Sequence, residues 1–172
     1  MKRGEEWTAK SLIEALRLER HPEEGGYFRE TYRSAESFEP GKGFAGIRSV
    51  GTAIYYLLTA DTWSALHRLP GDEIFHFYLG DPVEMLMLHP DGRDEILILG
   101  HDVRTMHVQH VVGGNIWQGS RLVNGGRWAL LGTTMAPGFD YRDYERGTAS
   151  LMADYPSRRT MIEALLPARR SA

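Results

Sequence analysis

Residues 64–80, SALHRLPGDEIFHFYLG, decide the fold, because they contain two short apolar runs separated by a turn. Residues 64–69 and 73–79 have the length and the aromatic and aliphatic content of β-strands. Between them, Pro70-Gly71-Asp72 combines a restricted backbone with a flexible glycine, which is typical of a tight connection. We therefore predict two neighbouring strands joined by a short turn.

The same pattern of short apolar runs extends in both directions from this stretch. Further runs that read as strands are 52–58 (TAIYYLL), 83–88, 95–99, 106–112, 121–123 and 127–131. His89-Pro90-Asp91-Gly92 and Asn124-Gly125-Gly126 are hairpin signals between consecutive runs. Short strands punctuated at regular intervals predict an all-β sandwich or barrel.

Helical patterns occur only at the two ends of the chain. Residues 9–17 carry apolar side chains at helical spacing, and Thr8 can cap them. Near the other end, Thr148 can cap a short turn, and Ser157 can cap a helix that Pro167 closes. We predict a single all-β domain, residues 1–172, with short N- and C-terminal helices.

The bulk composition excludes several classes of protein. The 172 residues contain no cysteine, which excludes disulfides and thiolate zinc sites and agrees with a reducing cytoplasm. A formal net charge of −3 argues against a general nucleic-acid binder, and the basic cluster Ala168-Arg169-Arg170 reads as a solvated tail.

The sequence also contains no pattern of a membrane or secreted protein. The charged residues 1–7 lead into no apolar run, so we see no secretory signal, and no run is long enough to span a membrane. We expect a cytoplasmic protein whose partner is a small molecule or a second copy of the chain.

Two motifs resemble those of the cupin superfamily. The first cupin motif places two histidines, a glutamate and a glycine in order, and His67, Glu73 and Gly80 match it while Leu69 replaces the second histidine. The second motif keeps its glycine at Gly114, but valine stands for its proline and tryptophan, Trp117, for its histidine.

Beyond these motifs, the chain resembles one branch, the cupin-5 proteins, which carry a domain of unknown function. The resemblance lies in residues 21–33, 64–78 and 136–140 and spans about 12–166. It implies a cupin barrel (a jelly roll, or double-stranded β-helix) and a homodimer, with strand exchange expected at residues 25–33.

A distant similarity also links the chain to the dTDP-sugar 3,5-epimerases, whose barrel is of the RmlC-like kind. Gly26, Phe28 and Glu30 reproduce their Gly-x-Phe-x-Glu element, and His67 falls where those enzymes place a base histidine. The similarity implies an epimerase or isomerase acting on a sugar nucleotide or related carbonyl compound. Such chemistry needs an acid on the opposite face, for which we consider Tyr32, with Tyr141 and Tyr144 also available.

A divalent metal is a second alternative, because an ordinary cupin supplies three histidines and one glutamate as ligands. Only His67 and Glu73 remain of those four, and His76, His110 and Gln118 are the nearby substitutes. By strand alternation His76 faces away from Glu73, so it would need a β-bulge to join the site. The opposing interpretation is that the apolar replacements have removed the metal, so no cofactor is assigned.

A binding module without catalysis is a third alternative. Phe75, Phe77 and Trp117, together with Trp63 and Tyr78, would line a cavity in which His67 and Glu73 orient the ligand. Burial and mutual ion pairing shift the pKa values of these two groups in opposite directions, and the sequence leaves the outcome open.

The function we predict is binding of a small polar ligand, sugar-like or acid-like, in the barrel pocket. Arg29, Arg33 and Arg68 could hold a phosphate or carboxylate, although for any single arginine a surface ion pair with Glu23, Glu24 or Glu30 is the preferred explanation. The other histidines attract less interest. His107 and His110 are expected on opposite faces of one strand, His89 and His101 at exposed turns, and His21 in a loop-shaping role.

Overall fold

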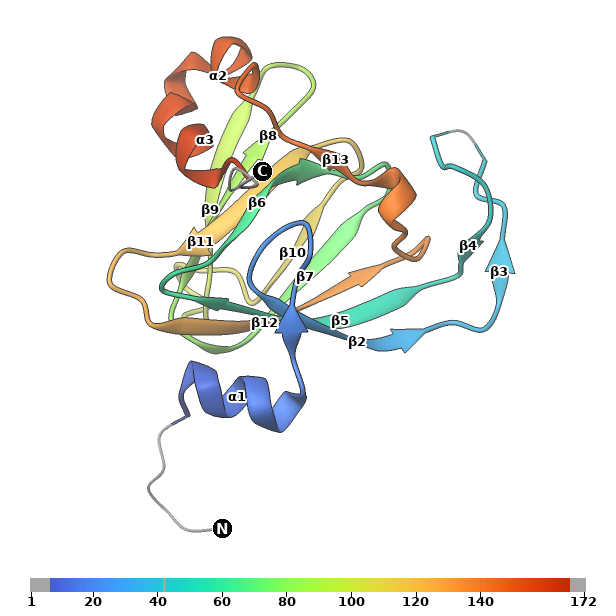
Figure 1. Cartoon of the computed structure of the whole chain (residues 1–172). Helices are drawn as coiled ribbons and strands as arrows, with labels where there is room; N and C mark the ends of the chain where they lie inside the picture. The colour runs from blue at the N-terminus through green and yellow to red at the C-terminus, as the bar shows by residue number, and fades with distance from the viewer. Residues whose placement is uncertain (1–6, 42, 168–172) are drawn as a thin grey trace, which may run out of the picture.

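Two antiparallel β-sheets form the body of this computed structural model, which describes residues 7–41 and 43–167 (Figure 1). In spatial order, the six-stranded sheet contains β1 (Glu19–Arg20), β2 (Tyr27–Arg33), β5 (Thr52–Thr59), β12 (Trp128–Met135), β7 (Glu73–Gly80) and β10 (Gln109–Val112). The five-stranded sheet contains β13 (Glu145–Arg146), β6 (Trp63–Arg68), β11 (Trp117–Leu122), β8 (Val83–Leu88) and β9 (Asp94–Leu99). A separate pair is formed by β3 (Ser37–Phe38) and β4 (Arg48–Ser49).

The short helices cover the outer faces of the two sheets. The first, α1 (Ala9–Leu16), is capped by Thr8 as predicted and packs Leu12 against the six-stranded sheet. At the other end of the chain, α2 (Leu151–Asp154) and α3 (Arg159–Leu165) pack against the five-stranded sheet (Figure 1). Two 3-10 turns, η1 (Tyr141–Asp143) and η2 (Pro156–Arg158), complete the described elements.

The capping predicted at the C-terminal helices is wrong. Neither Thr148 nor Ser157 occupies the N-cap position, which Ser150 holds in α2 and Arg158 in α3. The Ser157 hydroxyl instead donates a hydrogen bond of 2.8 Å to Asp94. None of the described helices is long and apolar enough to cross a membrane. The basic cluster at 168–170 and residues 1–6 lie outside the described residues.

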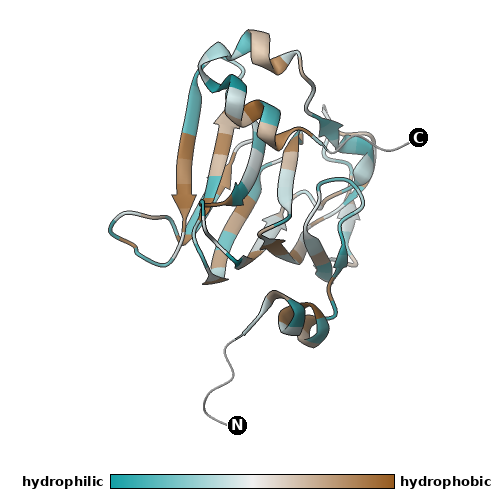
Figure 2. Ribbon diagram, turned by 60° about the vertical axis from the view of Figure 1, so that its left-hand side comes forward, coloured by the Kyte–Doolittle hydropathy of each residue, from teal (hydrophilic) through white to brown (hydrophobic). Residues whose placement is uncertain are grey.

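The main hydrophobic core lies between the two sheets. In β7, burial alternates, so that Glu73, Phe75 and Phe77 face the interior while His76 faces outward. Tyr56 and Leu131 join the two phenylalanines in this core. Hydrophobic residues accordingly concentrate in the strands and on the packed sides of the helices, whereas the connecting loops are largely hydrophilic (Figure 2).

Most predicted strands are present, but two predicted pairings are wrong. β6 and β7 belong to different sheets, so the turn at residues 70–72 crosses from one sheet to the other instead of closing a hairpin. The same holds for β11 and β12 around residues 124–126, whereas the hairpin of β8 and β9 is confirmed. The crossing brings His67 and Glu73 to the interior from opposite layers.

Candidate functional site

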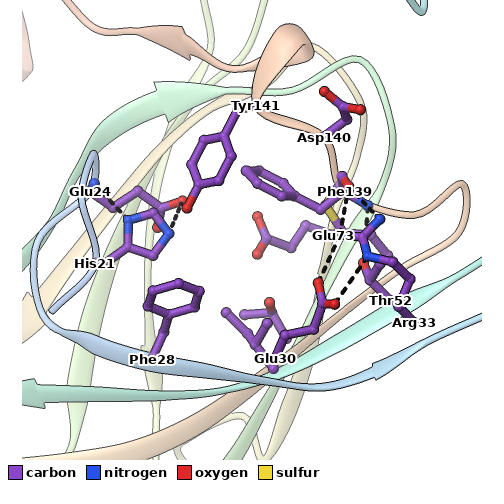
Figure 3. A pocket seen from close by; sticks show the side chains of 13 residues that line it. His21, Glu24, Phe28, Glu30, Arg33, Thr52, Glu73, Phe139, Asp140 and Tyr141 are labelled. Atoms are coloured by element: carbon purple, nitrogen blue, oxygen red, sulfur yellow. Dashed lines mark hydrogen bonds and ion pairs between the residues drawn. The ribbon is translucent and has the colours of Figure 1, made fainter. Parts of the chain in front are cut away.

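An open cavity of about 330 Å³ lies at one end of the space between the sheets. Its walls come from the segment between β1 and β2, from β2, β5, β7 and β12, and from residues 139–141 (Figure 3). The lining residues are His21, Glu24, Phe28, Glu30, Arg33, Thr52, Ile54, Glu73, Thr133, Met135, Phe139, Asp140 and Tyr141. In Figure 3 the Glu73 carboxylate points to the middle of this ring of side chains.

Four polar side chains meet at the inner end of the cavity. The Nε2 atom of His67 lies 3.8 Å from Oε1 of Glu24 and 3.9 Å from Oε2 of Glu73. Gln118 is the cross-strand partner of His67, and its Nε2 donates a 2.6 Å hydrogen bond to Oε2 of Glu73. The sequence-predicted residues His67, Glu73 and Gln118 are therefore brought together, and Glu24 joins them.

The two carboxylates favour the protonated form of the His67 imidazole. Its Nδ1–H donates to the carbonyl oxygen of Ala65 at 2.7 Å, since a carbonyl can only accept, and this leaves Nε2 facing the two carboxylates. Burial lowers the pKa of His67, but the negative charges of Glu24 and Glu73 outweigh burial and raise it from 6.5 to about 9. The ring of Tyr144 stacks on the imidazole, with 4.9 Å between centroids.

The segment that carries His21 and Glu24 is held by backbone contacts. The backbone amides of His21 and Ala65 donate to the carbonyls of Gly26 and Glu24, at 3.1 and 2.8 Å. Gly25 and Gly26 adopt φ angles of +95° and +70°, and a Cβ at either one would press on a backbone carbonyl of β6 or β5. Two consecutive glycines are thus needed to bring Glu24 to His67.

Carboxylates at the outer part of the cavity are paired with arginines. Arg33 makes a two-point hydrogen bond to Glu30, at 3.0 and 2.7 Å. Asp140 accepts two hydrogen bonds from Arg142, which lower the pKa of its carboxyl, and Arg48 lies 3.9 Å away. Each outer carboxylate therefore has its own guanidinium.

Aromatic rings form the side walls. Phe139 and Tyr141 pack edge to face with centroids 4.9 Å apart, and Phe28 packs against the His21 ring at 4.6 Å. Burial, and then the charge of Glu24, raise the pKa of Tyr141. The wall residues combine apolar surface with one phenol, which suits a small molecule with a carbon skeleton and polar substituents.

The donor atoms around His67 do not match a metal centre. No group of three or more histidine, aspartate or glutamate side chains in the described part of the chain is close enough to hold an ion. The separations of 3.8 and 3.9 Å exceed the roughly 3.4 Å expected between ligand atoms of a tetrahedral ion. Gln118 also turns its NH₂ group, which cannot ligate, toward Glu73.

Several sequence-predicted residues lie elsewhere. Tyr32 is 58% exposed on the outer side of β2, and Arg29 lies over the ring of Tyr55 on the outer face of the six-stranded sheet. Arg68 pairs with Glu145 at 2.7 Å on the outer side of β6.

Strand alternation also turns His76 and Trp117 outward. His76 bonds Thr134 and Gln109, each at 3.1 Å, so it faces away from Glu73 as alternation predicts. Trp117 stacks against the Arg68 guanidinium, and its neighbour Gln118 points inward instead.

The predicted aromatic lining divides into two groups. Phe75 and Phe77 are interior core residues next to the polar cluster, but neither lines the cavity. Trp63 packs under the C-terminal helices with Trp117, and Tyr78 is exposed. The cavity uses other rings, those of Phe28, Phe139 and Tyr141.

Glu24 and His21 are the residues that sequence reasoning missed. Both lie in an irregular segment without periodicity, where no pattern assigns a side chain to the interior. A partial signal existed for their neighbours, because the Gly-x-Phe-x-Glu spacing puts Phe28 and Glu30 on one face of β2, and both line the cavity.

The prediction that His107 and His110 point to opposite faces is wrong. The strand begins only at Gln109, since the backbone of His107 bonds to the end of β9, and the two rings lie 5.7 Å apart. His89 is half-buried beside Glu95, 3.6 Å away, and not exposed.

Comparison with known proteins places the chain in a family. The family model described as Cupin superfamily (DUF985) matches residues 10–146. The uncharacterized protein YML079W of Saccharomyces cerevisiae is 31% identical over 149 residues, covering 80% of this chain and 74% of its own. Protein SO0799 from Shewanella oneidensis is 31% identical with a TM-score of 0.83, covering 94% of this chain and 98% of that one. A hypothetical protein from Leishmania major is 33% identical with the same TM-score, covering 93% and 99%.

A more distant structural neighbour shows the fold alone. Oxalate decarboxylase from Bacillus subtilis, described with Mn(II) centres, is 14% identical with a TM-score of 0.53. The match covers 86% of this chain but 37% of that chain. Together these matches identify the two facing sheets as a jelly-roll of the cupin type.

Proposed function

Since the chain belongs to the DUF985 branch of the cupin superfamily, we propose that its barrel cavity binds a small polar molecule, with Glu73 and Glu24 as the polar anchors. The size supports this, because a cavity of about 330 Å³ matches the lower end of ligand sites in proteins. The aromatic side walls and the polar inner end supply the usual combination of packing and orientation.

One observation carries the proposal. Glu73 is buried, yet its carboxylate points into the cavity, and within the described residues only Oε2 is hydrogen-bonded, to Gln118. The other oxygen, Oε1, receives no hydrogen bond from the described residues and stays accessible from the cavity, so it can accept a hydrogen bond from a donor there. A ligand with hydroxyl or N–H groups would supply that donor.

Proton-transfer catalysis with His67 as the base fits this arrangement less well. His67 is not among the residues that line the cavity, and its charged imidazole cannot accept a proton at neutral pH. His67 is better described as a positioning residue, which holds the charges of Glu24 and Glu73 in place.

The test is a screen of the purified protein against a metabolite mixture. Melting temperature and product formation are followed together, for the natural protein and for Glu73→Gln, with Glu145→Gln on the outer side of β13 as the matched control. We expect a compound that stabilises the natural protein and the control by 2 °C or more, on the order of what tenfold-excess ligand gives, but not Glu73→Gln. Equal stabilisation of all three would contradict the proposal, and steady product formation would favour an enzyme.

We also propose that the chain forms a homodimer through the outer face of its six-stranded sheet. On this face, Tyr78 and Val111 on the adjacent strands β7 and β10 are 46% and 51% exposed, and Tyr32 on β2 is 58% exposed, which is unusual for large apolar side chains. Sedimentation equilibrium tests it: the natural protein is expected to be dimeric and Val111→Lys to be monomeric. A concentration-independent monomer would contradict it.

A further inference from the structure

The charges at the inner end of the cavity do not balance. Glu24 and Glu73 contribute two carboxylates, with 14% and 10% of their side chains exposed. Within the described part of the chain, their ion-pair partners are imidazoles alone, those of His67 and His21. The sign of the remaining charge therefore depends on whether His21 is protonated.

His21 supplies no positive charge. Its Nδ1 accepts hydrogen bonds from the backbone amides of Glu24 and Glu23, at 2.9 and 3.3 Å. A ring nitrogen that accepts must carry a lone pair, so the ring is neutral and its Nε2–H faces Glu24. Two carboxylates and one imidazolium leave about one negative charge at a largely buried point.

This excess is confined to the inner end. Glu30 is bound at two points by Arg33, and Asp140 by Arg142, so the outer carboxylates carry no uncompensated charge. An arriving ligand therefore meets neutral pairs at the mouth and a negative centre inside.

A second, independent observation indicates an occupant at the same point. His67 is 1% exposed, and its Nε2, directed at the two carboxylates that line the cavity, has no hydrogen-bond partner. Oε1 of Gln118, which is 2% exposed, is likewise without one. Unpartnered buried polar atoms of this kind are rare in folded proteins and call for a bound group or ordered water. An ammonium group can donate to Oε1 of Gln118, whereas the Nε2–H of His67 is itself a donor and needs an acceptor, such as an ordered water beside the carboxylates.

The walls around this point also favour a cation. Phe28, Phe139 and Tyr141 surround the opening, and the faces of aromatic rings attract positive charge. A carboxylate or phosphate would instead be repelled by the two carboxylates inside, and no unpaired guanidinium among the lining residues would compensate.

We infer that the ligand carries a cationic nitrogen, such as a primary ammonium group, which lies against the carboxylates of Glu24 and Glu73 with its carbon skeleton between the aromatic walls. This inference rests on the proposed function, since it names the class of molecule that the same cavity takes. It replaces the acid-like ligand, one of the two kinds expected from the sequence, with a basic one.

Three compounds of the same shape test the charge preference: benzylamine, benzyl alcohol and benzoate, titrated into the protein calorimetrically at pH 7. We expect benzylamine to bind roughly tenfold more tightly than benzyl alcohol, as one charge-assisted contact provides, and benzoate to bind least. In Glu73→Gln the preference should fall to within about threefold, whereas the matched variant Glu145→Gln, on the outer side of β13 and away from the cavity, should keep it. Glu24→Gln provides a second removal of charge if Glu73→Gln does not fold, as judged by circular dichroism.

The outcomes separate this inference from the proposal beneath it. If the alcohol or the acid binds more tightly than the amine, and Glu73→Gln loses that binding, the ligand is not cationic but the cavity is still a binding site. If amine binding is unchanged in both Glu73→Gln and Glu24→Gln, the amine binds at another place on the protein, and the inference is wrong. If none of the three compounds binds at millimolar concentration, both the proposed binding cavity and the preference for a cationic ligand are contradicted.

Discussion

Replacing Glu24 by glutamine removes one of the two negative charges that hold His67 protonated. At a separation of 3.8 Å and an effective dielectric constant of about 20, each carboxylate stabilises the imidazolium by about 4 kcal/mol. The rise of the His67 pKa from 6.5 to about 9 corresponds to roughly 3 kcal/mol in total, because burial opposes the charges. Loss of either carboxylate should therefore return the pKa of His67 to near or below 6.5.

Histidine NMR measures this directly. The seven histidines are followed from pH 5 to 10, with His67 assigned by its absence in His67→Gln. We expect a midpoint near 9 in the natural protein and a large decrease in Glu24→Gln and in Glu73→Gln. Glu30→Gln is the matched control and should leave the midpoint unchanged, since Arg33 already neutralises Glu30.

The same pKa appears in the pH dependence of stability. A group whose pKa is higher in the folded state stabilises fully below its unfolded value, 6.5, and loses that contribution as pH rises through about 9. Urea unfolding of the natural protein should lose roughly 3 kcal/mol over this window, and Glu24→Gln should lose much less. A His67 midpoint near 6.5 in the natural protein, or one that Glu24→Gln leaves at 9, would refute the reasoning.

Three further predictions concern the Arg48–Asp143 ion pair, the turn at Gly114 and metal binding. Arg48→Met should cost about 3–5 kcal/mol in urea unfolding, because it leaves the buried carboxylate of Asp143 without its partner 2.6 Å away. The exposed Arg142→Met is its control and should cost less than about 1 kcal/mol; similar losses would contradict this account. Gly114→Ala should destabilise by about 1–3 kcal/mol or more, since a Cβ would overlap the Pro70 carbonyl, and an unchanged melting temperature would show that the turn can move. Titration with Mn²⁺ or Zn²⁺ should detect no site tighter than about 10 μM, and stoichiometric binding below that would overturn the conclusion that the donor set does not fit a metal.

The sequence predicted the positions of the strands better than it predicted which strands pair. Regularly punctuated apolar runs identified most strands, because alternation and turn chemistry are local properties. Which strands share a sheet is a non-local property, and the turn at residues 70–72 reads the same whether it closes a hairpin or crosses between layers. The hairpin predicted across residues 124–126 was wrong for the same reason.

The candidate site shows the same division. His67 and Glu73 lie on strands, so alternation and the family motif together predicted that they meet, whereas Gln118 was considered only as a nearby substitute ligand. Glu24 lies in an irregular segment, and its position depends on two left-handed glycines and on a backbone contact to Ala65. Nothing in a one-dimensional pattern encodes such a contact. Tyr32 and Arg29 were chosen for their chemistry alone. The pleat of β2 turns Arg29 outward, and the register shift between Glu30 and Tyr32 turns Tyr32 outward.

The polar cluster joins both layers of the barrel, since Glu73 comes from one sheet and His67 and Gln118 from the other. Amide hydrogen exchange can therefore show whether the cavity holds a ligand, even when the ligand has not been identified. A molecule held at this junction would slow exchange in β7 and in β6 and β11 at once, because opening either layer would release it. Protection confined to one layer would instead mark attachment at the periphery.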